Sequence, residues 1–220
     1  MKKYVASFTA ALALGFLATS TLAQQNLTAE PKFYAGAEIG SYSSKDYTKE
    51  LASTLVSQVG GTATASQDST ISNSRIFGGI NVNENIGLEL GYNQTSSYGF
   101  RFSGVSRTAV AYSGTASAKF GGLDYSVLFR PNVSTGLNGL FFRLGGHSLD
   151  QKTDVRLTAG NVTVSNNDNH SGTGALYGFG YDLKLSNTWG MRISYTSLYN
   201  VAGISGNDGY FVNIGVLAKF

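Results

Sequence analysis

The 220-residue chain contains no cysteine and only two prolines. Without cysteine it can form no disulfide framework, and it can carry no lipid anchor on an N-terminal cysteine. Proline cannot donate a backbone hydrogen bond within a sheet, so its scarcity suits a chain built mostly of paired strands.

Charged residues are also few. They make up 13% of the chain, about half of the ~25% that is usual in soluble domains. The formal net charge of +3 includes Lys2 and Lys3, without which 14 basic residues face 13 acidic ones. The sequence has no basic patch, which predicts that nucleic acid is not a partner. So few charges make a wholly water-facing exterior hard to build.

Long apolar runs are missing beyond the N-terminus, since no later window approaches the roughly 18 apolar residues of a membrane helix. Residues 1–23 begin with Lys2 and Lys3, continue with an apolar run, and end with small residues before Gln24. This pattern predicts a cleaved secretory signal peptide over 1–23 and one domain over 24–220. The alternative, a membrane-anchoring helix, would need a longer apolar run, of about 20 residues.

What the sequence does contain is alternation. In the final segment, "GYFVNIGVLAKF", apolar side chains occupy every second position from Tyr210 to Phe220. Such period-two patterns predict strands with two different faces. We predict eight of them, at approximately 32–43, 71–82, 86–96, 119–130, 139–149, 173–185, 189–198 and 209–220.

The predicted connections alternate in length. Short turns at 83–85, 131–138 and 186–188 alternate with longer segments, rich in Ser, Thr, Asn and Gly, at about 43–70, 97–118, 150–172 and 199–208. Compact domains rarely carry several loops longer than about 15 residues. Transmembrane β-barrels combine short turns on one side with long loops on the other. The predicted fold is therefore all-β: an eight-stranded, antiparallel, transmembrane up-and-down β-barrel.

The polar face of these strands carries charges and many glycines. A soluble barrel, the alternative architecture, would place its apolar face inside, whereas a membrane barrel turns that face to lipid. In the membrane barrel the charges lie in a crowded lumen, where they must pair. We expect them either to plug the barrel or to line a conducting path. The predicted lumenal charge network is Glu38, Glu89, Asp124, Asp182, Arg75, Arg143 and Arg192.

Motifs for catalysis and metal binding are weak. Both histidines precede serine, as His147–Ser148 and His170–Ser171, but adjacent residues of a strand point to opposite faces, which argues against a dyad. The "NNDNHS" stretch around His170 is expected to be a solvated loop, with loose cation binding as the alternative. In the first long loop, "KELASTLVSQV" has apolar residues at helical spacing; a short surface helix and an irregular or strand-extending loop are both open.

Several stretches resemble the OmpA-like transmembrane barrel family, including its small opacity-type surface proteins. They are "KFYAGAEIG", "RIFGGINVNENIGLELGYNQT", "LFFRLGG" and "GYDLKLSNTWGMRISYTSL". The resemblance covers the strands, omits the long loops, and includes no peptidoglycan-binding domain after the barrel. It implies a terminal signal read by the outer-membrane assembly machinery, here Tyr210, Val212, Ile214, Val216 and Phe220.

The resemblance also implies that paired lumenal charges act as a gate. Glu89, Arg143, Asp182 and Arg192 match the family's charged positions. Two departures are expected to rewire the network: Glu38 stands where members carry a basic residue, and Ser194 stands where they carry an acid.

The leading functional hypothesis is a monomeric, non-enzymatic outer-membrane protein without a cofactor or metal. Its loops would face the cell exterior and contact lipopolysaccharide, other envelope components or host-surface molecules, because exposed loops on a rigid scaffold commonly carry binding. A small gated ion-conducting pore is the first alternative. A lipopolysaccharide-modifying membrane enzyme is the second.

Overall fold

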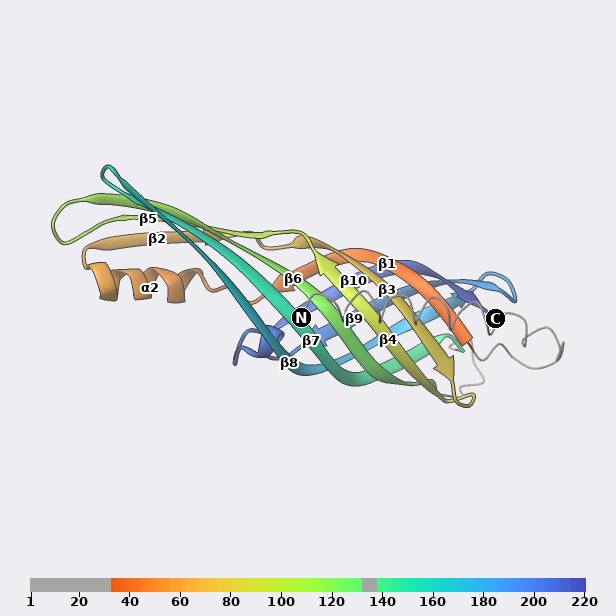
Figure 1. The fold of residues 1–220 in the computed structure, drawn as a ribbon. Helices are drawn as coiled ribbons and strands as arrows, with labels where there is room; N and C mark the ends of the chain where they lie inside the picture. The colour runs from red at the N-terminus through yellow and green to blue at the C-terminus, as the bar shows by residue number, and fades with distance from the viewer. Residues whose placement is uncertain (1–32, 132–137) are drawn as a thin grey trace, which may run out of the picture.

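The computed structural model describes residues 33–131 and 138–220. The predicted signal peptide lies outside these residues, as does most of the 131–138 turn. Within them, eight antiparallel strands close into a barrel (Figure 1). The barrel strands are β1 (Phe33–Ser44), β3 (Ile71–Asn81), β4 (Ile86–Thr95), β6 (Ala111–Phe129), β7 (Leu140–Ala159), β8 (Val162–Lys184), β9 (Trp189–Leu198) and β10 (Gly209–Lys219).

The barrel closes where β10 pairs with β1, from Tyr34 opposite Lys219 to Ser44 opposite Gly209. Beyond this register, the backbone N–H of Phe220 donates to the carbonyl of Phe33 at 2.9 Å, and the N–H of Phe33 donates back at 3.1 Å. Closure matters because hydrocarbon offers no hydrogen-bond partner to an open sheet edge. Within the described residues, no helix is long and apolar enough to cross a membrane.

On one side the wall continues beyond the barrel. The C-terminal part of β6, residues 121–129, pairs with β4. Its N-terminal part, residues 111–118, pairs with β5 (Tyr98–Val105). Strand β2 (Thr62–Gln67) pairs with β5, and β7 and β8 stay paired up to Ala159 opposite Val162. We call this part the extension; it comprises α2 (Thr48–Val59), β2, β5, and segments 111–118, 152–159 and 162–169 of β6, β7 and β8. It forms the left end of Figure 1.

The prediction of loops at 97–118 and 150–172 was therefore wrong. Strand β6 begins at Ala111, β7 runs on to Ala159, and β8 begins at Val162. The sequence signal for a membrane strand is apolar alternation, which arises because one face meets lipid. Beyond the lipid no face needs to be apolar, so Ser-, Thr- and Asn-rich strands pair through their backbones without that signature.

The 43–70 segment combines two of the alternatives left open, a helix and a strand that extends the wall. Helix α2 lies beside β2, with Leu51 and Leu55 half-buried and Val59 exposed. At its start, the Thr48 hydroxyl and backbone N–H donate to the Asp46 carboxylate at 2.7 and 2.9 Å, and these bonds lower the pKa of Asp46. The 199–208 segment contains a short 3-10 helix, η2 (Val201–Gly203).

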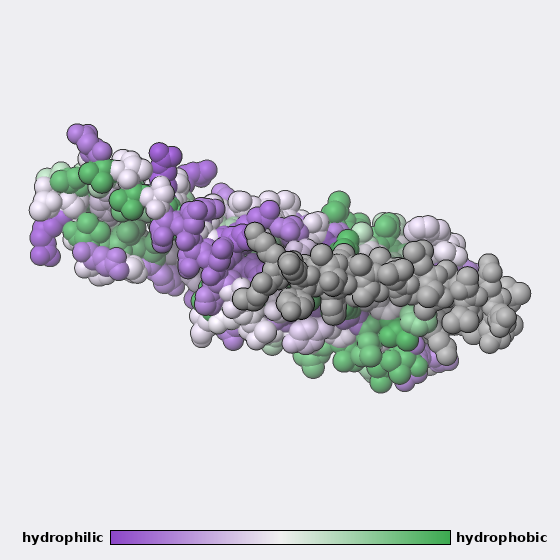
Figure 2. Space-filling view, in the orientation of Figure 1, coloured by the Kyte–Doolittle hydropathy of each residue, from purple (hydrophilic) through white to green (hydrophobic). Residues whose placement is uncertain are grey.

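The outer wall of the barrel is apolar. Leu144 is 70% exposed, Ile39 68% and Ile76 64%. Tyrosines stack on this surface toward the extension, where Tyr177 faces Tyr199 at 5.6 Å between ring centroids. Figure 2 shows hydrophobic side chains on the barrel wall and hydrophilic ones where the barrel passes into the extension. This is the outward-facing arrangement of a membrane barrel, opposite to that of a soluble one.

The lumen is filled in layers. Near the turns, Tyr34, Phe77 and Leu217 form a buried apolar cluster. Toward the extension, a larger cluster includes Tyr42, Phe211 and other side chains; its remaining buried members are Ile71, Tyr98, Ala118, Phe120, Leu149, Leu176, Leu198 and Val201. The lumen is thus partly apolar, which the sequence pattern did not predict. Charged side chains lie between these two layers.

Candidate functional site

The seven predicted network residues come from seven different strands and meet in the lumen. Each stands at an inward position of its strand, because inward and outward side chains alternate along a pleated strand. Asp182 is the least buried, with a side chain that is 10% exposed. The other six are at most 4% exposed: Glu38, Arg75, Glu89, Asp124, Arg143 and Arg192.

Arg75 is the centre of the network. Its guanidinium donates to Glu38 and Glu89 at 2.8 Å each, and to both oxygens of Asp124 at 2.9 and 2.7 Å. Arg192 donates to both oxygens of Asp182 at 2.6 and 2.9 Å, and to Glu89 at 2.5 Å. Glu89 therefore links the two arginines. Paired, bidentate contacts of this kind are what offsets the large desolvation cost of buried charges.

Two further arginines complete the network. Arg143 donates to Asp124 at 2.7 Å. Arg130, which the prediction omitted, lies 3.5 Å from Asp182. Four arginines then face four acids, so the described network is formally neutral. The signal for Arg130 was present in the sequence, since it shares the inward face of β6 with Asp124 and lies just past the end of that strand.

The two departures from the family pattern contact each other. The Ser194 hydroxyl donates to Glu38 at 2.8 Å, and Arg75 holds the other oxygen of Glu38. An acid at position 194 would repel Glu38, whereas a serine there donates to it. The exchange at Glu38 and the exchange at Ser194 therefore compensate for one another.

Aromatic rings cover the network on the turn side. The Arg192 guanidinium carbon lies 4.6 Å from the ring centroids of both Phe77 and Phe141. Arg130 lies 5.6 Å from the ring of Tyr34. These distances fit cation–π contacts, which gain strength where water is excluded. Chemically, the arrangement holds strands together and fills the lumen.

The histidines do not form a catalytic pair with their neighbouring serines. His147 is buried, and its Nε2 lies 3.0 Å from the Tyr199 carbonyl oxygen, while Ser148 is exposed on the opposite face. His170 lies in β8 and not in the predicted loop. The extended backbone there turns successive "NNDNHS" side chains to opposite faces. In the described part of the chain, no group of three or more His, Cys, Asp or Glu could hold a metal.

The predicted assembly residues share the outer face of β10. Tyr210, Val212, Ile214 and Val216 are between 40% and 51% exposed. Phe220 follows the strand and hydrogen-bonds with Phe33, as described above. The structure thus places four of these side chains on the lipid-facing surface, while Phe211, Asn213 and Leu217 point into the lumen.

The sequence pattern of the outer membrane protein beta-barrel domain family matches residues 9–220. The chain belongs to this family. Outer-membrane localisation follows from the membership. A search of curated proteins found no match.

Several solved outer-membrane proteins are similar to the chain. The outer membrane protein OprG of Pseudomonas aeruginosa is 12% identical with a TM-score of 0.45, and the match covers 86% of this chain and 96% of OprG. CarO2 of Acinetobacter baumannii is 15% identical with a TM-score of 0.40, covering 85% of this chain and 98% of CarO2. Neisserial surface protein A is 13% identical with a TM-score of 0.37, covering 86% and 97%.

Proposed function

We propose that this outer-membrane barrel is a surface-interaction protein that anchors the extension outside the cell. The observation that carries the proposal is the extension itself, a five-stranded sheet with a helix beside it, built beyond the barrel rim. A barrel that only spanned the membrane would not need it. A paired sheet presents side chains from fixed positions, which lowers the entropic cost of binding compared with a floppy loop.

The difference between the two ends of the barrel supports this orientation. At one end of the barrel the described turns, such as 82–85 and 185–188, are short. At the opposite end the strands are joined by longer segments, and most of these residues belong to the extension. Outer-membrane barrels place short turns in the periplasm and long connections outside. In this proposal the binding partners are lipopolysaccharide, envelope components or host-surface molecules that meet the extension.

The filled lumen favours this function over a conducting pore. A conducting path would need continuous polar space, but apolar clusters lie on both sides of the charge network. The charged groups of the network pair with one another and connect the strands. This is sufficient for a network that only fills and closes the lumen. Planar bilayers containing the refolded protein are therefore expected to remain electrically silent.

Trimming the extension while keeping the barrel tests the proposal. One variant removes 152–169, whose ends Lys152 and Asn169 are register partners, and joins the remaining strands by Asn-Gly, a pair suited to two-residue hairpins. A second variant removes 101–115, whose ends are also partners. Both are expected to insert normally and to lose binding of cells to host surfaces or to purified lipopolysaccharide.

Correct insertion is checked by heat-modifiable migration on gels, with wild type and an empty strain as references. Adhesion, serum survival and lipopolysaccharide binding that are unchanged in both trimmed variants would overturn the interaction function.

A further inference from the structure

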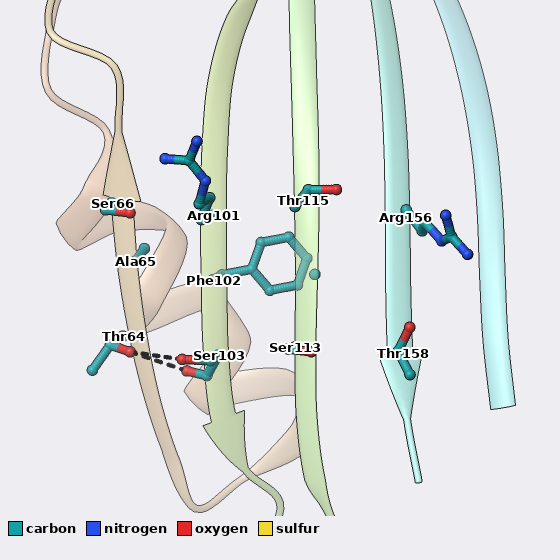
Figure 3. A pocket seen from close by; sticks show the side chains of 11 residues that line it. Thr64, Ala65, Ser66, Arg101, Phe102, Ser103, Ser113, Thr115, Arg156 and Thr158 are labelled. Atoms are coloured by element: carbon teal, nitrogen blue, oxygen red, sulfur yellow. Dashed lines mark hydrogen bonds between the residues drawn. The ribbon is translucent and has the colours of Figure 1, made fainter. Parts of the chain in front are cut away.

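The outer face of the extension carries a groove of about 510 Å³ over β2, β5, β6 and β7 (Figure 3). Six of its lining residues carry hydroxyls, arginines stand at two of its sides, and Ala65, Phe102 and Gly114 complete the lining. We call this the arginine groove, defined by Arg101, Arg156, Thr64, Ser103, Ser113 and Thr115. Because these hydroxyl side chains are short, they leave an open surface, with hydroxyl groups on it, between the two arginines.

The strand register sets the spacing of the arginines. Arg101 on β5 is opposite Thr115 on β6, which is opposite Arg156 on β7. Their backbones are two strands apart, about 10 Å. In Figure 3 the two guanidinium groups extend to either side of Thr115. This spacing suits two separate anionic groups on one ligand better than a single anion held between both arginines.

Neither arginine is held in an ion pair within the described residues. Both are exposed, and neither makes an ion pair or hydrogen bond with another residue of the described ranges. The next row toward the barrel holds two acids on this face: Asp154, beside Ser117, and Asp68, whose carboxylate lies over Gly99. Lumenal arginines, by contrast, each contact an acid. Guanidinium groups bind phosphate oxygens in a planar, two-pronged geometry.

The position of the groove indicates the source of its ligand. Its side chains are on the same face of β6 as Leu123, which is exposed on the barrel wall. Thr115 precedes Leu123 by eight residues on β6, in the direction of the extension. With a rise of about 3.3 Å per residue and a strand tilt of about 40°, it lies roughly 20 Å from Leu123 along the barrel axis. The groove therefore faces sideways, above the hydrocarbon, toward neighbouring molecules of the same leaflet.

We infer that the arginine groove binds a phosphorylated saccharide of the surrounding lipopolysaccharide. Arg101 and Arg156 each bind a phosphate group, and Thr64, Ser103, Ser113 and Thr115 offer hydroxyls to the sugar. This inference rests on the proposed function, because it needs the extension to lie in the outer saccharide layer.

The test uses the mature protein refolded in micelles free of lipopolysaccharide. Binding of deacylated, phosphorylated lipopolysaccharide saccharide is measured by calorimetry for wild type and R101Q/R156Q. The matched control is K49Q/R107Q, which removes the same charge at exposed positions outside the groove. We expect the groove variant to bind about tenfold more weakly or worse, and the control to stay within about twofold of wild type.

Two further arms identify the chemistry. Enzymatically dephosphorylated saccharide should bind wild type weakly, and R101K/R156K should lie between wild type and the Gln variant, because lysine keeps charge but loses the two-pronged geometry. Equal binding by wild type and R101Q/R156Q, or none by wild type, would overturn the inference. Tighter binding of a sulfated glycan than of the phosphorylated saccharide would overturn the assigned source.

The result can be separated from the function proposed above. If the trimmed variants lose binding but R101Q/R156Q does not, the groove is wrong and the surface function stands. If trimming changes no binding at all, the surface function itself fails.

Discussion

Replacing Arg192 by alanine is expected to destabilise the barrel by about 3–5 kcal/mol. The change removes the two-pronged partner of Asp182, which keeps only Arg130 at 3.5 Å, and one partner of Glu89 in the lumen. It also removes the contacts with Phe77 and Phe141. Uncompensated charge away from water is the costly element. Urea unfolding in lipid vesicles, followed by tryptophan fluorescence and heat-modifiable migration, measures the effect.

Two matched variants show whether the pairing is responsible. Arg156→Ala removes an arginine from the exposed face of the extension and should change stability by less than about 0.5 kcal/mol. D182N/R192M removes one charge of each sign, so no carboxylate is left without Arg192 at position 182, and it should recover part of the loss. Glu89 keeps Arg75, and Arg130, which loses Asp182, is the most exposed arginine of the network. An Arg192→Ala barrel as stable as wild type would show that the network does not hold the strands together.

Deleting Phe220 is expected to reduce outer-membrane insertion several-fold. The backbone of Phe220 makes two hydrogen bonds with Phe33 at the closing seam. The family resemblance further implies that the terminal strand is read during assembly, with Tyr210, Val212, Ile214 and Val216 on its lipid-facing side. The measurement is the heat-modifiable fraction in isolated outer membranes at matched expression.

Two comparisons accompany this deletion. Deleting Thr108, in the turn between β5 and β6, removes a residue far from the seam and should leave insertion near wild type. Phe220→Tyr keeps an aromatic side chain and the backbone bonds, and should insert well. Equal insertion of the Phe220 and Thr108 deletions would contradict the assembly role.

The barrel could be predicted from sequence because contact with lipid requires apolar side chains at every second position of a membrane strand. Residues such as Leu144 and Ile193 face lipid, so their neighbours in sequence must face the lumen, and each membrane strand alternates. The extension could not be predicted in this way. In segments 111–118 and 162–169 both faces are free to be polar, and the pairing is held by backbone hydrogen bonds that leave little trace in side-chain hydrophobicity.

The sequence indicated which charged residues share the inward face of the strands, but not which of them pair with each other. Alternation places Glu38, Arg75 and Glu89 on one face, but it gives no pairing across the lumen. Arg75 reaches Asp124 across the intervening strand β4, over Gly91, and this contact depends on the register of three neighbouring strands. The arginine groove was missed for a related reason. Arg101 and Arg156 are 55 residues apart in sequence, and the shared register with Thr115 alone aligns them.

Single-cysteine labelling measures directly whether the barrel spans the membrane with the extension outside the cell. The natural chain has no cysteine, so Asn161→Cys, Glu84→Cys and Leu144→Cys each provide one reporter. With a membrane-impermeant maleimide on intact cells, Cys at 161 should be labelled at the tip of the β7–β8 hairpin. Cys at 84 should be labelled only after permeabilisation, and Cys at 144 in neither case. Labelling at 84 but not at 161 on intact cells would show that the extension does not lie outside the cell.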